Sequence, residues 1–261
     1  MAPQVVILCG GMGARLREET EFRPKPMVTI GDRPILWHIM KIYAHQGFRD
    51  FVLCLGYKGE MIKEYFYHYE VFNNDFTVEL GSPRRVEVHN IHPENGWKVT
   101  LADTGACALK GARIKRAAPY IQGDEFLLAY GDCLADIDLA ALVAFHRRHG
   151  RAATVTGVNP ASRFGELRVR GDVVESFTEK PQDVPGLING GFMVLSRRVL
   201  DALTDDDACD FEYGPLEGLA AQGQLMVYRH PGFWACMDTL RDMEALNRLW
   251  SDGHPPWKVW T

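Results

Sequence analysis

The sequence predicts an α/β fold built on a parallel sheet with helices on both faces. Apolar runs at residues 4–9 (QVVILC) and 50–55 (DFVLCL) are typical of strands that are buried on both sides. Each run is followed by apolar residues at helical spacing, over 35–46 and 60–69, and Gly47 is placed to end the first helix. Because strand and helix alternate, neighbouring strands should run parallel and the helices should cover the sheet.

The rest of the chain continues this pattern with one irregular stretch. A buried strand at 125–130 (EFLLAY) leads into Gly131 and Asp132, and Asp138 and Gly150 bound a predicted helix over 138–149. Later elements are expected as strands at 152–157, 173–178 and 190–195, and as helices at about 212–222 and 239–251. Residues 75–101 hold two strand-like pieces, near 77–80 and 97–101, around a polar segment that we interpret as a surface excursion. No composition shift marks a linker, so we expect a single domain over 1–261.

Composition argues against several classes of protein. The formal net charge is -5 and no run of five Lys or Arg occurs, which disfavours a nucleic-acid partner. No stretch approaches the roughly 20 apolar residues that cross a bilayer, so no membrane association is expected. Six cysteines occur without a Cys-x-x-Cys pair, which disfavours a structural zinc site. With no signal peptide in view, we expect a reduced, cytoplasmic protein.

A glycine-rich turn directly after the first strand is the leading candidate for a phosphate site. Residues 10–16 read GGMGARL, and glycines at the carboxyl edge of a sheet let backbone N–H groups approach phosphates. The P-loop pattern is absent, and Leu16 replaces the third glycine of the dinucleotide fingerprint. From this motif alone, a turn that merely joins strand to helix remains equally possible. Two prolines in RPKPM fix Lys25 on stiff backbone nearby, which adds a second cation to Arg15.

The segment GGMGARLREETEFRPKPM resembles the start of the sugar-1-phosphate nucleotidylyltransferases, whose usual pattern is GGxGTRL followed by a KP-containing segment. Further stretches match in the same order across nearly the whole chain: GYKGEMIKEYF, LADTG, AYGD, FTEKP, INGGFMVL and HPGFWACMDTLRD. The resemblance implies a Rossmann-like, mixed, mainly parallel sheet, the fold of nucleotide-diphospho-sugar transferases. It also implies a nucleotide-binding N-terminal part and a sugar-binding C-terminal part.

The segments are most similar to the branch of the family that uses CTP and glucose 1-phosphate, so these are the expected substrates. The alternative is the same reaction with dTTP, UTP or GTP, or with another sugar 1-phosphate. By analogy with the relatives, a homo-oligomer is expected. There are three departures from the family pattern: Ala14 replaces a Ser or Thr, Cys9 stands where an alanine is frequent, and Cys133 stands where a glycine is common.

The resemblance also implies roles for individual residues. Arg15, Lys25 and Lys180 would be the catalytic cations, and Asp132 and Asp238 would bind Mg²⁺. The implied nucleotide contacts are Leu8, Gly10, Gly11, Met12, Gly13, Asp103, Thr104, Gly105, Arg113 and Tyr130. The implied sugar contacts are Glu179, Lys180, Asn189 and Gly190.

Elementary chemistry agrees with this set of residues. A sugar phosphate has a second pKa of about 6 and is mostly dianionic at neutral pH, so it needs no general base. Catalysis then consists of offsetting negative charge and aligning the attack, for which cations and a divalent metal suffice. For Asp132 and Asp238 the simpler roles of turn residue and helix N-cap remain open on residue type alone.

Two rival classes are weighed against this hypothesis. A glycosyltransferase would use an acidic DxD motif, and residues 136–138 read DID, but Arg15 and Lys25 would then have no task. A non-catalytic lobe that binds a sugar nucleotide is disfavoured by the full set of charged residues.

Overall fold

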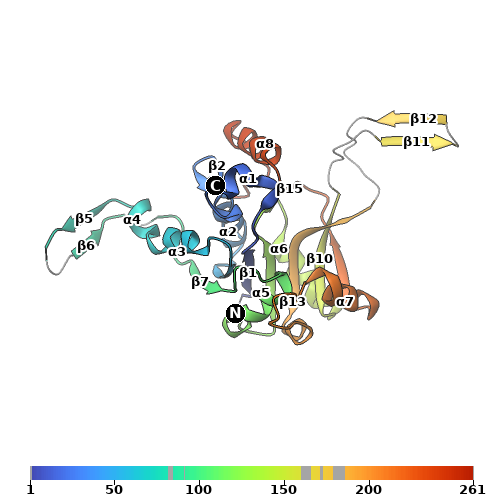
Figure 1. Ribbon diagram of the computed structural model, residues 1–261, viewed down its shortest axis with the longest axis horizontal. Coiled ribbons are helices and arrows are strands. Elements are labelled where there is room, and N and C mark those ends of the chain that lie inside the picture. The colour runs from blue at the N-terminus through green and yellow to red at the C-terminus, as the bar shows by residue number, and fades with distance from the viewer. Residues whose placement is uncertain are drawn as a thin grey trace.

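The computed structural model describes residues 2–81, 85–90, 92–159, 166–170, 173–178 and 186–260. Within them a seven-stranded sheet forms the centre of the molecule (Figure 1). Its strand order is β14 (Leu225–Arg229), β10 (Ala153–Val158), β13 (Ile188–Ser196), β8 (Glu125–Tyr130), β1 (Gln4–Cys9), β4 (Asp50–Leu55) and β7 (Lys98–Asp103). Strand β13 runs antiparallel to both of its neighbours, and the other pairs are parallel. The predicted mixed, mainly parallel α/β fold is confirmed.

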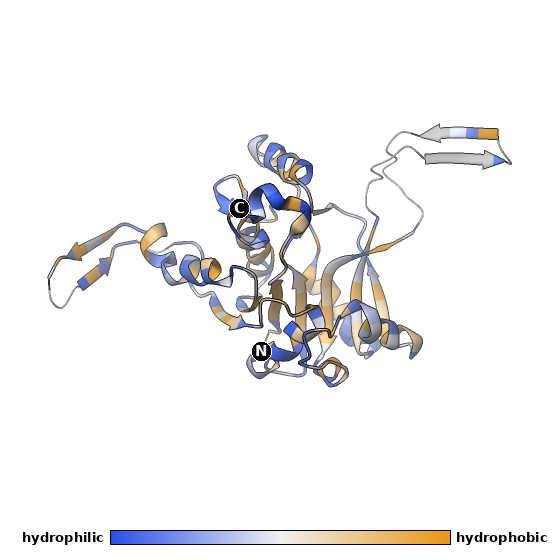
Figure 2. Cartoon of the chain, in the orientation of Figure 1, coloured by the Kyte–Doolittle hydropathy of each residue, from blue (hydrophilic) through white to orange (hydrophobic). Residues whose placement is uncertain are grey.

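Alternate residues of the central strands enter two separate cores, one on each face of the sheet. On β1, Val5 and Ile7 pack into the first core, whereas Val6 and Leu8 pack into the second. The first core is covered by α2 (Ile35–His45), α6 (Leu139–His149) and α8 (Leu240–Ser251), and the second by α5 (Lys110–Ala117) and α7 (Glu217–Ala221). Figure 2 shows the apolar colour concentrated on the central strands. Burial on both faces explains why these strands are continuous apolar runs.

Helix ends follow the local capping chemistry. The Asp138 side chain accepts a hydrogen bond from the backbone N–H of Ala141 at 2.8 Å, and Gly150 ends α6 in the left-handed region at φ 64°. At the start of α8, Thr239 and Asp242 form a capping box. The predicted single helix over 60–69 is instead α3 (Gly59–Tyr67) followed by α4 (Tyr69–Asn73), because the chain leaves helical geometry at His68.

Two hairpins lie apart from the sheet, on opposite sides of the molecule (Figure 1). They are β5 (Phe76–Glu79) with β6 (Arg85–Val88), and β11 (Glu166–Arg170) with β12 (Val173–Thr178). The surface excursion expected in the middle of the chain is therefore β5–β6. The second strand expected there, near 97–101, is β7 and belongs to the central sheet, because it pairs with β4 from Lys98 to Asp103.

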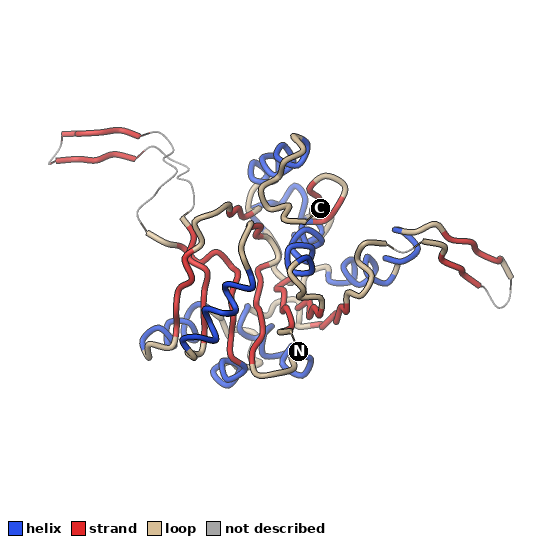
Figure 3. Tube along the Cα trace, turned by 180° about the vertical axis from the view of Figure 1, so that it is seen from behind, coloured by secondary structure: helices blue, strands red, loops and turns tan. Residues whose placement is uncertain are grey.

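Shorter elements connect the main helices and strands. They are η1 (Ala14–Leu16), α1 (Arg17–Thr20), η2 (Lys25–Met27), β2 (Thr29–Ile30), β3 (Arg33–Pro34), η3 (Ala118–Tyr120), β9 (Cys133–Ala135), η4 (Arg197–Ala202), η5 (Glu212–Leu216) and β15 (Trp234–Cys236). Figure 3 shows helices in front of and behind the strands of the sheet. In the described part of the chain, no helix is long and apolar enough to span a membrane.

Candidate active site

A cavity of about 870 Å³ opens at the carboxyl edge of the parallel strands. The strands β1 and β8 lie side by side and end there together, with Leu8 opposite Tyr130. The loops that follow these strands form one wall, and the beginning of β13 and the end of β15 form another. The cavity gathers most of the predicted site residues: Leu8, Gly10, Gly11, Gly13, Arg15, Lys25, Arg113, Tyr130, Asp132, Asn189 and Asp238.

The glycine-rich loop after β1 is held in a tight turn. Gly13 has φ 62°, and its carbonyl accepts hydrogen bonds from the backbone N–H of Leu16 (2.9 Å) and the hydroxyl of Thr20 (3.1 Å). A side chain at Gly10 would overlap the guanidinium of Arg113, since an added Cβ would lie 2.1 Å from its nearest nitrogen. By contrast, an added Cβ at Gly11 would meet no atom within 4 Å. The loop therefore packs against Arg113 at Gly10, whereas Gly11 faces open space.

Arg113 joins three loops beneath the cavity. Its side chain comes from α5, the residue is only 4% exposed, and its guanidinium donates to the carbonyls of Gly10 (3.0 Å), Leu55 (3.1 Å) and Gly105 (2.7 Å). A guanidinium offers five donors in a rigid fork, which suits this bracing role. Arg113 therefore brings a buried cation to the cavity wall.

Lys25 lies between the two aspartates that were predicted to bind metal. Its ammonium contacts Asp132 Oδ2 at 2.5 Å and Asp238 Oδ1 at 2.6 Å, and Arg15 contacts the other oxygen of Asp238 at 3.1 Å. The Lys25 side chain is 12% exposed. Burial alone would lower the pKa of Lys25, but the charge of Asp132 and the hydrogen bonds to Asp132 and Asp238 outweigh burial and raise it. Two carboxylates from distant parts of the sequence therefore converge on one cationic position.

Local structure aims both carboxylates at this position. Lys25 begins η2 immediately after the extended Pro24, so its backbone is stiff. Asp132 follows the packed Gly131, where an added Cβ would lie 2.5 Å from the Leu8 carbonyl oxygen. Asp238 is not the N-cap of α8, because Thr239 has that role and the Asp238 carboxylate faces Lys25 and Arg15.

The opposite side of the cavity is a hydrogen-bonded polar cluster. The Asn189 amide donates to the Tyr130 hydroxyl at 3.1 Å and accepts from the backbone N–H of Gly191 at 3.0 Å. The Tyr130 hydroxyl in turn donates to Glu212 at 2.5 Å. Burial and the charge of Glu212 raise the pKa of Tyr130, so the phenol keeps its proton and acts as the donor.

Sequence reasoning missed two members of this cluster, Lys110 and Glu212. The Lys110 ammonium contacts Glu212 Oε1 at 2.5 Å and lies 5.2 Å from the ring centre of Tyr130. The second oxygen of Glu212, Oε2, is buried without a hydrogen-bond partner among the described residues. No motif links these two residues, because their pairing arises only when α5 and η5 pack together. Trp234 also lines the cavity and donates to the Gly190 carbonyl at 2.8 Å.

The remaining predicted residues lie near the cavity or outside the part of the chain that the structure describes. Met12 is exposed on the glycine loop. Asp103, Thr104 and Gly105 form the end of β7 and the turn behind Arg113, where Thr104 donates to the Leu55 carbonyl at 2.6 Å. Glu179 and Lys180 lie outside the described residues, so their sugar-binding roles stay predictions.

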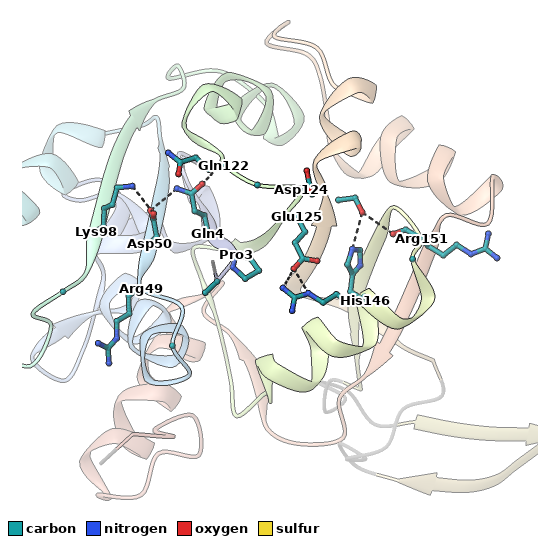
Figure 4. Close-up of a pocket in the computed structure, with 17 residues that line it drawn as sticks. Pro3, Gln4, Arg49, Asp50, Lys98, Gln122, Asp124, Glu125, His146 and Arg151 are labelled. Atoms are coloured by element: carbon teal, nitrogen blue, oxygen red, sulfur yellow. Dashed lines mark hydrogen bonds and ion pairs between the residues drawn. The ribbon is translucent and has the colours of Figure 1, made fainter.

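A second cavity, of about 790 Å³, lies at the opposite, amino edge of the sheet (Figure 4). Four of its charged residues form two ion pairs: Lys98 contacts Asp50 at 3.0 Å, and Arg147 contacts Glu125. The loops at this edge precede the parallel strands, whereas ligands of open α/β sheets bind beyond the carboxyl ends. The carboxyl-edge cavity is therefore the candidate active site.

Comparison with known proteins agrees with this geometry. The model of the family described as nucleotidyl transferase matches residues 4–252. The chain therefore belongs to the nucleotidyl transferase family. Within that family, it is 51% identical to the glucose-1-phosphate cytidylyltransferase of Salmonella typhimurium strain LT2 over 98% of this chain and 99% of that one. It is 47% identical to the probable glucose-1-phosphate cytidylyltransferase of Bacillus subtilis strain 168, over 98% of this chain and 100% of that one.

Solved structures of lower identity share the fold. HddC from Yersinia pseudotuberculosis superposes with a TM-score of 0.68 at 23% identity, covering 95% of this chain and all of that one. UDP-glucose pyrophosphorylase from Acinetobacter baumanii also gives a TM-score of 0.68, at 18% identity, covering 98% of this chain and 96% of that one.

Proposed function

We propose that the chain transfers the cytidylyl group of CTP to α-D-glucose 1-phosphate, giving CDP-glucose and pyrophosphate. One observation carries this proposal: Lys25 joins Asp132 and Asp238 directly beside a glycine-rich loop at the carboxyl edge of the sheet. The site thus has a place for a triphosphate and a divalent cation. The cytidylyltransferase relatives, which match this chain over almost its full length, support the choice of CTP and glucose 1-phosphate.

We propose Mg²⁺ as the cofactor, with Asp132 and Asp238 as its protein ligands. Oxygen ligands and one or two carboxylates suit this ion. The Lys25 ammonium, which sits between the two carboxylates, indicates that this position favours a cation. When bound, Mg²⁺ would offset the negative charge of the triphosphate and of the departing pyrophosphate.

The protein's own groups then bind and align two anions. Arg15 and Lys25 contribute positive charge beside the triphosphate, and Gly11 lets the backbone approach the phosphates closely. Arg113 fixes the shape of this loop from beneath. The dianionic sugar phosphate attacks the α-phosphorus of CTP, and the bond to the β-phosphate oxygen breaks. No side chain has to remove a proton.

The sugar would bind toward the polar cluster on the far side. Asn189 offers both donor and acceptor groups to sugar hydroxyls. Gly190, also predicted to contact the sugar, instead faces packed protein, because an added Cβ there would lie 2.8 Å from the Val158 side chain. Glu179 and Lys180 are proposed to hold the sugar hydroxyls and the sugar's phosphate, on the strength of the EKP motif alone.

Pyrophosphate release tests the proposal directly. Purified protein is incubated with glucose 1-phosphate and Mg²⁺, and with CTP, UTP, dTTP, ATP or GTP in separate reactions. The proposal expects turnover with CTP and far lower rates with the others, since a buried polar site rejects a mismatched base strongly. Equal rates of pyrophosphate release with UTP and CTP would overturn the base assignment. No pyrophosphate release with CTP would overturn the proposed reaction.

We also propose a homo-oligomer in the cytoplasm. The hairpin β5–β6 extends from the body of the protein and exposes several apolar side chains: Phe76, Val86 and Val88. Exposed apolar groups on a projecting hairpin suit contact with a second copy of the chain. Sedimentation velocity of the full chain checks the assembly, and a monomer at all concentrations would contradict it.

A further inference from the structure

Two cysteines face each other beside the proposed magnesium ligands. Strands β9 and β15 pair Cys133 with Cys236 in antiparallel register. The backbone N–H of Met237 donates to the Asp132 carbonyl at 2.9 Å, which makes the neighbouring Cys133–Cys236 pair a non-hydrogen-bonded one. In such pairs the Cα atoms are only about 4.5 Å apart and the side chains lie close together.

Asp132 completes a group of three donor atoms. The sulfurs of Cys133 and Cys236 and one carboxylate oxygen of Asp132 all lie within 4.8 Å of one another. The Cys133 thiol donates to Asp132 Oδ1 at 3.2 Å, whereas Oδ2 contacts Lys25. All three residues line the cavity, where Cys133 is 3% exposed and Asp132 and Cys236 are partly exposed. Among the described residues, no other three such side chains meet this closely.

The donor set differs in chemistry from the magnesium pair. Mg²⁺ takes oxygen ligands, whereas two sulfurs and one carboxylate suit Zn²⁺ and similar thiophilic ions. Two sulfurs bound to a tetrahedral Zn²⁺ at about 2.3 Å are roughly 3.8 Å apart. Cys133 and Cys236 therefore need only a small closing movement.

We propose that Cys133, Cys236 and Asp132 form a binding site for a thiophilic divalent cation, distinct from the magnesium site but sharing Asp132 with it. Binding of Zn²⁺ releases the two thiol protons to solvent, and three protein ligands leave one tetrahedral position for water. No oxidation is involved. Cys133, which stands where a glycine is common in the family branch, supplies one of the two sulfurs.

Sharing Asp132 makes the site inhibitory. A Zn²⁺ ion that draws the Asp132 carboxylate toward the sulfurs withdraws it from the cationic position occupied by Lys25. This consequence rests on the proposed function, whereas the binding itself does not. Zn²⁺ should therefore inhibit turnover with Mg²⁺ present, and a chelator selective for zinc should restore it.

Cobalt absorption tests the binding independently of activity. The reduced full-length protein, kept in a non-thiol phosphine reductant and freed of metal, is titrated with Co²⁺. We expect one equivalent to produce a near-ultraviolet sulfur-to-cobalt charge-transfer band and strong tetrahedral visible bands. The variant Cys107→Ala, which removes an exposed thiol that does not line the cavity, should keep the band. Cys133→Ala and Cys236→Ala should each weaken cobalt binding at least ~10-fold, the cost of disturbing even a supporting group around a metal.

Thermal melts of each variant confirm folding before the spectra are compared. A wild-type protein without the charge-transfer band overturns the proposal, and so does a band that persists in the double Cys133→Ala, Cys236→Ala variant. Inhibition by Zn²⁺ provides the second readout: Cys236→Ala, which leaves the hydrogen bond from Cys133 to Asp132 in place, should keep its magnesium-dependent turnover and lose the inhibition. A protein that shows the cobalt band but no turnover with any nucleotide refutes the proposed function and leaves this site in place.

Discussion

Replacing Lys25 with methionine tests the organisation of the site. The change keeps the length and apolar stem of the side chain and removes the charge that holds Asp132 and Asp238 together. Breaking a buried ion pair by removing one partner costs about 3–5 kcal/mol. The two carboxylates are 23% and 18% exposed, so water recovers part of this loss. We expect the free energy of unfolding to fall by about 2–3 kcal/mol.

Magnesium should behave differently in the variant and in the wild type. In the wild-type protein without nucleotide, Mg²⁺ must compete with the Lys25 ammonium for Asp132 and Asp238. In Lys25→Met that competitor is gone, so Mg²⁺ should bind more tightly and restore stability. An ion that binds only the folded state adds about 2.7 kcal/mol at 100 times its Kd. Turnover should fall by about 10²–10³-fold even with saturating Mg²⁺, because a preorganised cation beside the triphosphate is lost.

Urea denaturation with and without Mg²⁺ measures these effects. The matched control is Lys98→Met, which removes a lysine that contacts Asp50 at 3.0 Å on the surface. An exposed pair contributes about 0–1 kcal/mol, so this variant should lose little stability and show no new response to Mg²⁺. The reasoning is refuted if Lys25→Met is as stable as the wild type, or if Mg²⁺ stabilises both proteins equally.

Three further predictions concern the carboxylates, the polar cluster and a buried histidine. Asp132→Asn and Asp238→Asn should each lower pyrophosphate release at least ~10²-fold while the circular dichroism spectrum shows an intact fold, and wild-type rates in both would remove the metal assignment. Tyr130→Phe removes the donor to Glu212, so urea melts should show a loss of about 1–2 kcal/mol, and an unchanged midpoint would argue against this bond. Burial, followed by the neighbouring basic groups, lowers the pKa of His146 to about 4, whereas an unfolded histidine titrates at about 6.5. The contribution of His146 to the free energy of unfolding is fully present above pH 6.5 and is lost as the pH falls toward 4, by up to ~1.4 kcal/mol per pH unit. In His146→Asn, the free energy of unfolding should depend less steeply on pH across this range, as melts at several pH values can measure.

The strands buried on both faces were predictable from sequence. At β1, β4 and β8 the apolar runs are continuous, and the predicted bounds coincide with those of the structure. Strand β14 (Leu225–Arg229) was missed, because it lies at the edge of the sheet and its half-exposed residues show no clean period. Helix α5 was not assigned bounds, because its sequence KGARIKRA is dominated by charge. The family resemblance implied a mixed sheet, but neither it nor periodicity identified β13 as the antiparallel strand.

The candidate site was predictable only in part. Motifs at the ends of strands located the glycine loop, Lys25, Asp132 and Asp238, since loops at one edge of a parallel sheet must meet. Their pairing could not be predicted, because contacts between residues so far apart in the sequence depend on the packing of β9, β15 and η2. For the same reason, the sequence did not predict the contact between Cys133 and Cys236 or the cluster around Glu212.

Oxygen-18 tracing is the most direct test of the proposed reaction. The wild-type protein is incubated with CTP, Mg²⁺ and glucose 1-phosphate that carries oxygen-18 on its three non-bridging phosphate oxygens. The masses of the products are then measured by mass spectrometry. Direct attack of the sugar phosphate on the α-phosphorus predicts CDP-glucose that retains all three labels and pyrophosphate that carries none. Label in the released pyrophosphate, or CTP consumption without labelled CDP-glucose, would contradict the proposed reaction.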